Sequence, residues 1–429
     1  MKPLITLIVL LALCVTGCKT SPKQITNSND YNKYLEYQEN GMLQLARNDY
    51  EFWEKKLEKD PNQFPYLAKS AASQSLLFAE TGHIESLKMA EIKLVQANEH
   101  TNYNTPSYLR ALSRNYISQH RFKEALDLLN KAEINGEKLH STQKMLFDVH
   151  MELGNADEAE AYLDEIENYK DFDFLIRLSK WSDHKGDLDN AILYLKKASE
   201  IVEASNNKSL MQWSYTNLAD YYGHAGEIEL SYKHYLKALE LNPNDAYAKK
   251  GIAWIVYSYE RNPDEALRIL DSTSKYHTAP DYNLLKAEIA EFMGNDMLKQ
   301  NFLQAYAAQI SDGNYGDMYN AYNILLEVEE YKNYTKAANI ALKEVVNRPT
   351  PQSYDLLAWT YHNHGSPEAA LEIMENHVVN KTFEPESLYH MAEIYKANGK
   401  IAEAKELKKE LIESAFELGP LMAKNIKAI

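Results

Sequence analysis

The chain has 429 residues, and its composition and charge exclude several classes of protein. Its 15 glycines and 13 prolines are too few to punctuate the many hairpins of an all-β sandwich or barrel. A hydrophobic fraction of 45% excludes wholesale disorder, and a formal net charge of −16 argues against nucleic acid as a partner, because phosphate binding needs dense cations. We therefore expect two or three folded domains or one long repeat array.

The first 17 residues have the pattern of a secretory signal. A basic start at Lys2 precedes an uncharged apolar run from Leu4 to Val15. This run is shorter than the roughly 20 residues of a permanent membrane-spanning helix, and its length suits the apolar part of a signal peptide. We predict a signal peptide over residues 1–17.

Residues 15–18 read Val-Thr-Gly-Cys, which resembles the lipobox of bacterial lipoproteins. In that family, small residues allow a peptidase to cleave before the cysteine, and the thiol is the group to which diacylglycerol is attached. The resemblance implies that Cys18 is lipidated and anchors the protein to a membrane of the bacterial cell envelope. Lys19, in place of aspartate, favours the outer membrane. A plain signal peptide with an incidental cysteine is the alternative.

The segment that follows Cys18 is polar. Residues 19–30 are rich in Lys, Thr, Ser and Asn and contain Pro22. This composition is typical of flexible linkers, so we predict a tether over residues 18–35 between the lipid and the folded body. Cys14 lies within the signal peptide, so the mature chain has no cysteine pair for an internal disulfide.

The sequence repeats with a period of about 34 residues. Gly365 and Gly399 are separated by 34 positions, and so are Ala370 and Ala404. Upstream, three columns of matching residues are Leu112, Leu146, Leu178 and Leu218; Ala125, Ala159, Ala191 and Ser231; and His120, Gly154, Gly186 and Gly226. A generic helical bundle has apolar periodicity but no reason to repeat small residues at fixed offsets, so we favour a repeat array.

These columns resemble the tetratricopeptide repeat, a helix–turn–helix unit, and residues 215–245 are the best copy. Ala219 and Ser231 occupy the small positions at which the two helices approach closely. Gly226 suits the left-handed turn between the helices, and Pro243 stops the second helix. The resemblance implies an all-α fold, a tetratricopeptide-like solenoid of about ten helical hairpins.

The repeats are uneven along the chain. They are clear over residues 106–245 and 351–418 and weaker elsewhere. From Ile252 to Ala266 the spacing is 14 residues, instead of the 13 found in the other copies. We therefore expect an N-terminal array over residues 36–276 and a C-terminal array over residues 277–429.

In the family resembled here, the first helix of each repeat lines a concave groove that binds peptides. Transferring the groove positions to this sequence implies a binding surface formed by Arg110, Arg114, Lys144, Lys180, Trp213, Asp220, Tyr247, Trp254, Tyr322 and Trp359. Arg, Tyr and Trp are usual anchors for extended or helical peptides, although any one tyrosine could instead bridge adjacent repeats. The clamp by which some relatives hold a C-terminal carboxylate is absent, because Asp148 stands where asparagine is needed.

The sequence has none of the common motifs for catalysis. It lacks a phosphate-binding loop, a dinucleotide glycine pattern, a zinc-protease motif and a serine elbow. With no cysteine pair for zinc, and with carboxylates scattered over amphipathic helices, we expect no metal, no cofactor and no enzyme activity. We predict a membrane-anchored scaffold that binds a protein or peptide. The alternatives are a glycan-binding outer-membrane lipoprotein for nutrient uptake and an assembly factor for envelope proteins.

Overall fold

The computed structural model describes residues 23–36 and 39–429, and every regular element in these ranges is a helix. The elements are α1 (Ser28–Leu35), α2 (Gly41–Lys59), α3 (Phe64–Thr81), α4 (Ile84–His100), α5 (Pro106–Ser118), α6 (Phe122–Asn135), α7 (Leu139–Glu152), α8 (Ala156–Glu165), α9 (Phe172–His184), α10 (Leu188–Ala204), α11 (Lys208–His224), α12 (Ile228–Leu241), α13 (Ala246–Trp254), the π-helix η1 (Ile255–Tyr259), α14 (Pro263–Thr273), α15 (Asp281–Phe292), α16 (Asp296–Ile310), α17 (Asn320–Glu329), α18 (Tyr334–Asn347), α19 (Pro351–Asn363), α20 (Pro367–His377), α21 (Pro385–Ala397), α22 (Ile401–Glu413) and α23 (Ala415–Ile426). Among these helices, none is both long and apolar enough to cross a membrane. The predicted signal peptide and Cys18 lie outside the described residues.

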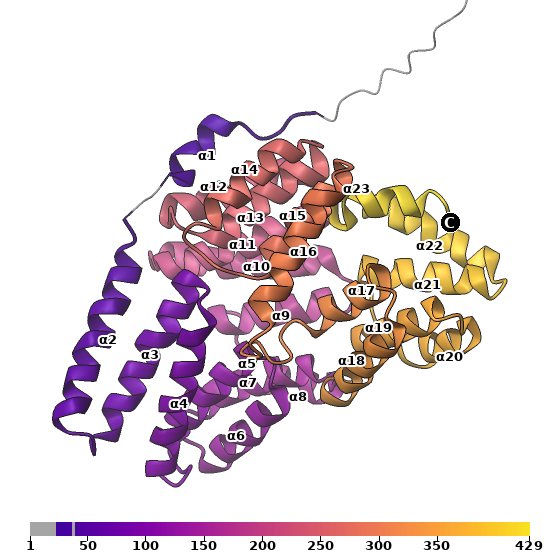
Figure 1. The fold of residues 1–429 in the computed structure, drawn as a ribbon. Coiled ribbons are helices and arrows are strands. Elements are labelled where there is room, and N and C mark those ends of the chain that lie inside the picture. The colour runs from indigo at the N-terminus through magenta and orange to yellow at the C-terminus, as the bar shows by residue number, and fades with distance from the viewer. Residues whose placement is uncertain (1–22, 37–38) are drawn as a thin grey trace, which may run out of the picture.

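Helices α3 to α22 pair into ten successive hairpins in the part of the chain that the structure describes (Figure 1). The turn between α7 and α8 has Gly154 at φ +73°, and the turn between α11 and α12 has Gly226 at φ +74°. Glycine adopts this left-handed conformation without a steric penalty, which is why the glycine column marks the turns. The predicted all-α solenoid of about ten hairpins is confirmed.

The column of small residues lies where paired helices approach each other. Ala125, Ala159 and Ala191 have no exposed surface, and Ser231 is almost completely buried. The Ser113 hydroxyl donates to the Ala125 carbonyl oxygen at 3.3 Å and the Ser179 hydroxyl to that of Ala191 at 2.6 Å, so the paired helices lie close together and a larger group would overpack the contact. The repeated small residues therefore allow the close helix pairs from which the solenoid is built.

The 14-residue spacing between Ile252 and Ala266 is explained by a π-helix. Residues Ile255–Tyr259 form η1, which continues α13 up to the left-handed turn at Arg261. A π-helical turn contains one residue more than the α-helical turn that it replaces, so it absorbs the insertion. Ala266 consequently has no exposed surface and keeps the small position of its hairpin.

The solenoid curves so strongly that the edges of its two halves meet. The backbone N–H of Thr278 donates to the carbonyl oxygen of Thr81 at 2.7 Å, and the guanidinium of Arg348 pairs with Glu152 at 2.7 Å. The partners are 197 and 196 positions apart, respectively, which is roughly six repeats. Hairpin turns of the first half therefore lie against inter-hairpin loops of the second half, one superhelical turn later.

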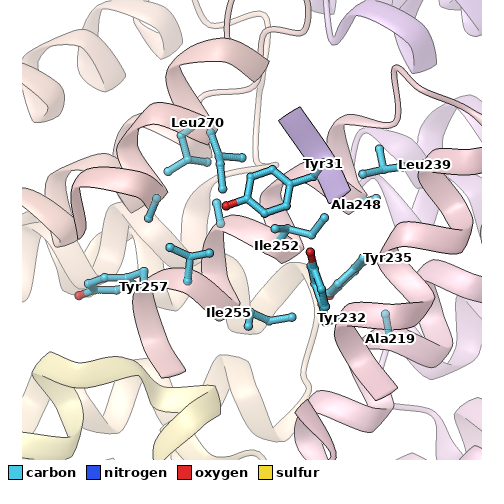
Figure 2. Packing of buried hydrophobic residues seen from close by; sticks show 14 of the residues in the cluster. Tyr31, Ala219, Tyr232, Tyr235, Leu239, Ala248, Ile252, Ile255, Tyr257 and Leu270 are labelled. Carbon is cyan, nitrogen blue, oxygen red and sulfur yellow. The ribbon is translucent and has the colours of Figure 1, made fainter. Parts of the chain in front are cut away.

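Hydrophobic packing is continuous across residue 276, where the sequence predicts the boundary between two arrays. The cluster in Figure 2 joins α11–α14 to Leu285 and Ile289 of α15. Farther along, Tyr315 in the connection between α16 and α17 packs on α4. These contacts link the two predicted arrays. The division of the chain at residue 276 stays a prediction.

The described part of the predicted tether is folded. The prediction of a flexible linker over residues 18–35 is wrong for α1, which lies beside α12 and α14 (Figure 1). Tyr31, Tyr34 and Leu35 are buried, and the Tyr31 ring enters the hydrophobic cluster of α11–α15 (Figure 2). Within this mostly polar segment, three large side chains lie on one face of a short helix, a pattern that composition alone does not show.

Polar contacts hold the segment before α1 in place. Glu260 accepts hydrogen bonds from the backbone N–H groups of Ile25 and Thr26 at 2.7 and 2.6 Å. The Tyr31 hydroxyl donates to Glu265 at 2.6 Å. Glu260, at the end of η1, and Glu265, in the first turn of α14, thus hold residues 23–35 against the solenoid. We call this segment, which lies more than 200 positions earlier in the sequence, the strap.

Candidate functional site

Three adjoining cavities lie between the two halves of the solenoid. Their volumes are 1010, 490 and 400 Å³, and Tyr322 and Glu386 line all three. We call this joined space the lumen. Its walls are mainly the first helices of hairpins, namely α7, α9, α13, α15, α17, α19 and α21, together with α23. The closure of the solenoid thus places a deep, half-open space between its two halves.

Five carboxyl groups in the lumen form an acidic cluster. Its members are Asp183 of α9, Glu288 of α15, Glu384 and Glu386 at the start of α21, and Glu417 of α23. Burial raises the pKa of every one of these carboxyls, and it raises that of Glu288 to about 7. The negative charge of Glu386 further raises the pKa of Glu288, and the charge of Glu384 raises that of Glu386. The cluster is therefore electrostatically connected, and part of it is protonated at neutral pH.

The start of α21 places two of these carboxyls in the lumen. Glu384 is the N-cap residue, Pro385 is the first helical residue, and Glu386 lies in the first turn. Negative charge is favourable here, because the unpaired N–H groups and the helix dipole are positive at this end. The preceding residue, Phe383, lies so close to the α9–α10 turn that a Cβ on Gly186 would be 2.8 Å from its ring. This contact between the two superhelical turns brings α21 opposite α9.

Four cations of the lumen are engaged by other carboxylates, whereas Lys185 lies over the Trp181 ring and Lys381 donates to the Asn376 carbonyl. Lys180 pairs with Glu152 at 3.0 Å, Lys250 pairs with Asp281, and Lys299 pairs with Glu291 at 2.7 Å and with Glu330. Arg348 pairs with Glu152 at 2.7 Å. By contrast, no member of the acidic cluster forms an ion pair with a lysine or arginine within residues 23–36 and 39–429. Glu417 contacts His224 at 3.9 Å, and the other four carboxyls form no ion pair within the described residues, so the lumen has an excess of acidic groups.

A buried polar network lies next to the acidic cluster. Asp355 of α19 is 3% exposed, and its Oδ2 accepts a hydrogen bond from Ser387 at 3.0 Å and contacts His390 Nδ1 at 2.9 Å. Its other oxygen, Oδ1, has no hydrogen-bond partner within the described chain. The ring of Trp359 stacks on His390 at 4.2 Å between centroids. Asp355 also lines the largest cavity, and its charge raises the pKa of Glu386, so the network adjoins the cluster.

Three residues that the repeat pattern predicts for the groove come together around the lumen. Lys180 lines the largest cavity, Trp254 lines the second, and Tyr322 lines all three. Trp359 lies behind this wall, where it is 7% exposed and its indole N–H donates to Glu329 at 3.0 Å. The repeat count thus identifies side chains on the concave surface in the later hairpins.

Asp220 and Tyr247 contact each other outside the walls of the lumen. The Tyr247 hydroxyl donates to Asp220 Oδ2 at 2.7 Å, and the Tyr235 hydroxyl donates to Oδ1. Burial raises the pKa of the Asp220 carboxyl. These residues bridge α11, α12 and α13, as the alternative interpretation of the tyrosines anticipates.

Four predicted groove residues of the first half do not line the lumen. Arg110 is 7% exposed and donates to the Glu137 carbonyl and to Thr142, and Arg114 reaches Met145 Sδ at 3.8 Å. The ammonium group of Lys144 lies between Asp171 and Asp173. The edge of Trp213 contacts Phe172, with 5.9 Å between ring centroids. The structure does not bring these four residues to the site that contains Tyr322, and their role in binding stays a prediction.

Repeat reasoning missed all five members of the acidic cluster. Glu384 precedes the first helix of its repeat, and Glu417 follows the last complete hairpin, so neither occupies a groove position. Glu288 belongs to a degenerate repeat in which the code is weak. A sequence signal exists only for Glu384 and Glu386, because Glu-Pro-Glu is a typical helix start. It does not reveal that this helix end faces a cavity.

The chain is similar to several solved helical-repeat structures at low sequence identity. The human IFIT1 dimer with m7Gppp-AAAA is 14% identical, with 76% of this chain and 75% of that chain covered and a TM-score of 0.48. The APC/C hetero-tetramer Cut9-Hcn1 is 14% identical, with 94% and 98% covered and a TM-score of 0.35. YrrB, a TPR protein with an unusual peptide-binding site, is 19% identical, with 46% and 95% covered and a TM-score of 0.27. No curated protein matches this sequence significantly.

The family model of the tetratricopeptide repeat matches residues 214–245 and 385–417. The first range covers most of the α11–α12 hairpin and agrees with residues 215–245, the copy that is clearest in the sequence. The second range covers the α21–α22 hairpin, whose first turn contributes Glu386 to the lumen. Two of the ten hairpins therefore match the tetratricopeptide repeat in sequence, and the chain is similar to that family over these two ranges.

Proposed function

We propose that this protein is a scaffold that binds a protein segment or peptide in the lumen and performs no catalysis of its own. A tetratricopeptide solenoid is suited to such binding, because stacked repeats present side chains along a continuous concave surface. The observation that carries the proposal is the lumen itself, where Lys180, Trp254 and Tyr322 come together from three helices. Aromatic anchors in a recessed pocket are the usual centres of binding energy.

We further propose that acyl chains on Cys18 hold this scaffold at the bacterial cell envelope, in the outer membrane. The support is the lipobox-like sequence at residues 15–18 after an apolar run. The next described residue, Lys23, pairs with Glu229 on α12 at 2.6 Å. Five residues of fully extended chain span at most about 17 Å, so a lipid on Cys18 would hold the α12 side of the body near the bilayer.

Site-specific photo-crosslinking tests the binding proposal. A photoreactive phenylalanine replaces Tyr322 in the lumen or, as a control, Tyr169, which is exposed between α8 and α9. We expect cells that naturally produce the protein to form a defined protein adduct from position 322 and none from position 169. An adduct from position 169 with none from 322 would place binding outside the lumen.

The anchoring proposal predicts the behaviour of two serine variants. Cys18→Ser should abolish labelling with radioactive palmitate and release the protein into the soluble fraction, because the thioether can no longer form. Cys14→Ser removes the signal-peptide cysteine and should leave labelling and membrane association intact. Continued labelling of Cys18→Ser would refute the lipid anchor.

A further inference from the structure

The charge of the lumen indicates which kind of peptide it accepts. We propose that the lumen is a receptor site for a basic peptide segment, whose Lys or Arg side chains sit between the acidic cluster and Asp355. The inference rests on the proposed peptide-binding function and adds the chemical class of the peptide. It is carried by an excess of acidic groups, by one buried unpartnered oxygen, and by the size and aromatic content of the cavity.

The carboxylates are the first argument. The acidic cluster comes from α9, from α15, and from α21 and α23 near the C-terminus, three parts of the chain that all line the lumen. Glu384 and Glu386 form no ion pair with a lysine or arginine of the described chain, whereas Lys180, Lys250 and Lys299 in the same walls are each paired. Grouping like charges in a recessed space is unfavourable, and an incoming cation reverses that cost. An anionic ligand would meet repulsion, because carboxyl groups outnumber lysines and arginines in the walls of all three cavities.

The second argument is the unsatisfied oxygen of Asp355. Buried polar atoms in folded proteins are almost always hydrogen-bonded, so an exception calls for an explanation. Oδ1 of Asp355 has no partner within the described chain, although the side chain is only 4% exposed, while Oδ2 is satisfied by Ser387 and His390. Asp355 and Glu386 line the same cavity, so a donor that enters there comes next to this carboxylate. Lysine and arginine carry only donors, which matches the missing interaction.

The size and aromatic content of the lumen favour a peptide over a small cation. A typical small-molecule pocket has a volume of roughly 300–1000 Å³. The largest part of the lumen measures 1010 Å³ by itself and adjoins two further cavities of 490 and 400 Å³. Trp254 and Tyr322 line the same walls as Glu384 and Glu386. Aromatic faces next to carboxylates suit lysine and arginine, which gain from both cation–π contact and ion pairing.

Fluorescence anisotropy with the purified full-length protein tests the inference. The probes are three labelled peptides of about twelve residues, rich in Lys and Ser, in Glu and Ser, or in Ser and Ala. The test variant is Glu384→Gln/Glu386→Gln, which removes two charges but preserves shape. The control is Glu406→Gln/Glu410→Gln, which removes two charges from the exposed face of α22.

We expect the basic peptide to bind, the acidic peptide not to bind, and the lumen variant to weaken binding at least about tenfold. The control variant should bind like the wild type, and added salt should weaken binding. Equal binding of all three peptides, or equal losses in the two variants, would overturn the inference but leave a peptide-binding scaffold in place. If no peptide binds while position 322 still crosslinks to a protein, the basic-segment inference fails and the proposed function stands. If position 322 also gives no adduct, both fail.

Discussion

At the scale of single residues, burial sets the protonation of several histidines. His277, in the connection between α14 and α15, forms a hydrogen bond with the Tyr282 hydroxyl, with 2.9 Å between Nδ1 and the oxygen. Burial lowers the pKa of His277 to about 4. Burial also lowers the pKa of His120, His150 and His184. Protonation of each of these rings is less favourable in the folded state than in the unfolded state. Acid therefore favours unfolding.

His277 gives a prediction with a definite sign. Its folded pKa lies below the ordinary value of 6.5, so the unfolded state binds more protons between these two values. The stability that the neutral His277 ring gives to the folded state is fully present above about pH 6.5 and is lost as the pH falls towards 4. We expect about 1 kcal/mol of the stability lost between pH 7.5 and 5.5 to come from this ring.

Urea unfolding at several pH values measures that contribution. His277→Asn should flatten the pH dependence by about this amount, since asparagine can still accept from Tyr282 and does not titrate. His140, which is exposed, provides the control variant His140→Asn, which should keep the wild-type slope. An unchanged slope in His277→Asn would show that the ring is solvated in the folded protein.

At the scale of elements, α1 shows how a short helix is stabilised by tertiary contact. It has eight residues, too few to be stable alone in water. The Asn27 side chain caps its N-terminus by accepting from Asn29 N–H at 3.1 Å. Its stability instead comes from Tyr31, which is 2% exposed in the cluster of α11–α15 (Figure 2).

Two substitutions of Tyr31 separate its apolar and polar contacts. Tyr31→Ala should lower the free energy of unfolding by about 3 kcal/mol and increase amide exchange in residues 23–35, because the helix loses its buried ring. Tyr31→Phe removes only the hydrogen bond to Glu265 and should cost about 1 kcal/mol. Unchanged exchange in Tyr31→Ala would mean that the contacts of Glu260 suffice to hold the strap.

At the scale of the whole molecule, contacts between superhelical turns create the lumen. Glycines at hairpin turns of the first half lie against loops of the second half, and Gly82 is the tightest case. A Cβ at Gly82 would be 2.1 Å from the carbonyl oxygen of Thr278, a backbone atom that cannot rotate away. Gly226 has nearly the same backbone conformation, with φ +74° against +72°, and nothing within 4 Å of its Cβ position.

This matched pair predicts how much closure contributes to stability. Gly226→Ala should lower the free energy of unfolding by about 1 kcal/mol, through backbone strain alone. Gly82→Ala carries the same strain and also displaces the edge of the second turn, so it should cost at least about 2 kcal/mol more. Thermal unfolding compares the stabilities, and small-angle scattering should show expansion for Gly82→Ala alone. Equal effects of the two variants would indicate that the turns do not meet in solution.

A small part of the lumen wall could be predicted from the sequence. Counting along the repeat identifies Trp254 and Tyr322 because both occupy first helices, which form the concave surface. The same count also gives Arg110, which instead donates to groups of the next hairpin. The count specifies a position along a helix but not what lies opposite, and only the curvature of the solenoid decides whether that position faces a cavity.

The sequence by itself determined the local structure of this protein. Small residues at close helix contacts, turn residues at left-handed positions and a period near 34 require helical hairpins that stack, since each repeat must bury its apolar face against the next. The tertiary structure alone decided where the chain meets itself again, roughly six repeats later. That distance is the sum of many small rotations between repeats, and no motif encodes it. The lumen, the acidic cluster and the docking of α1 all follow from this closure.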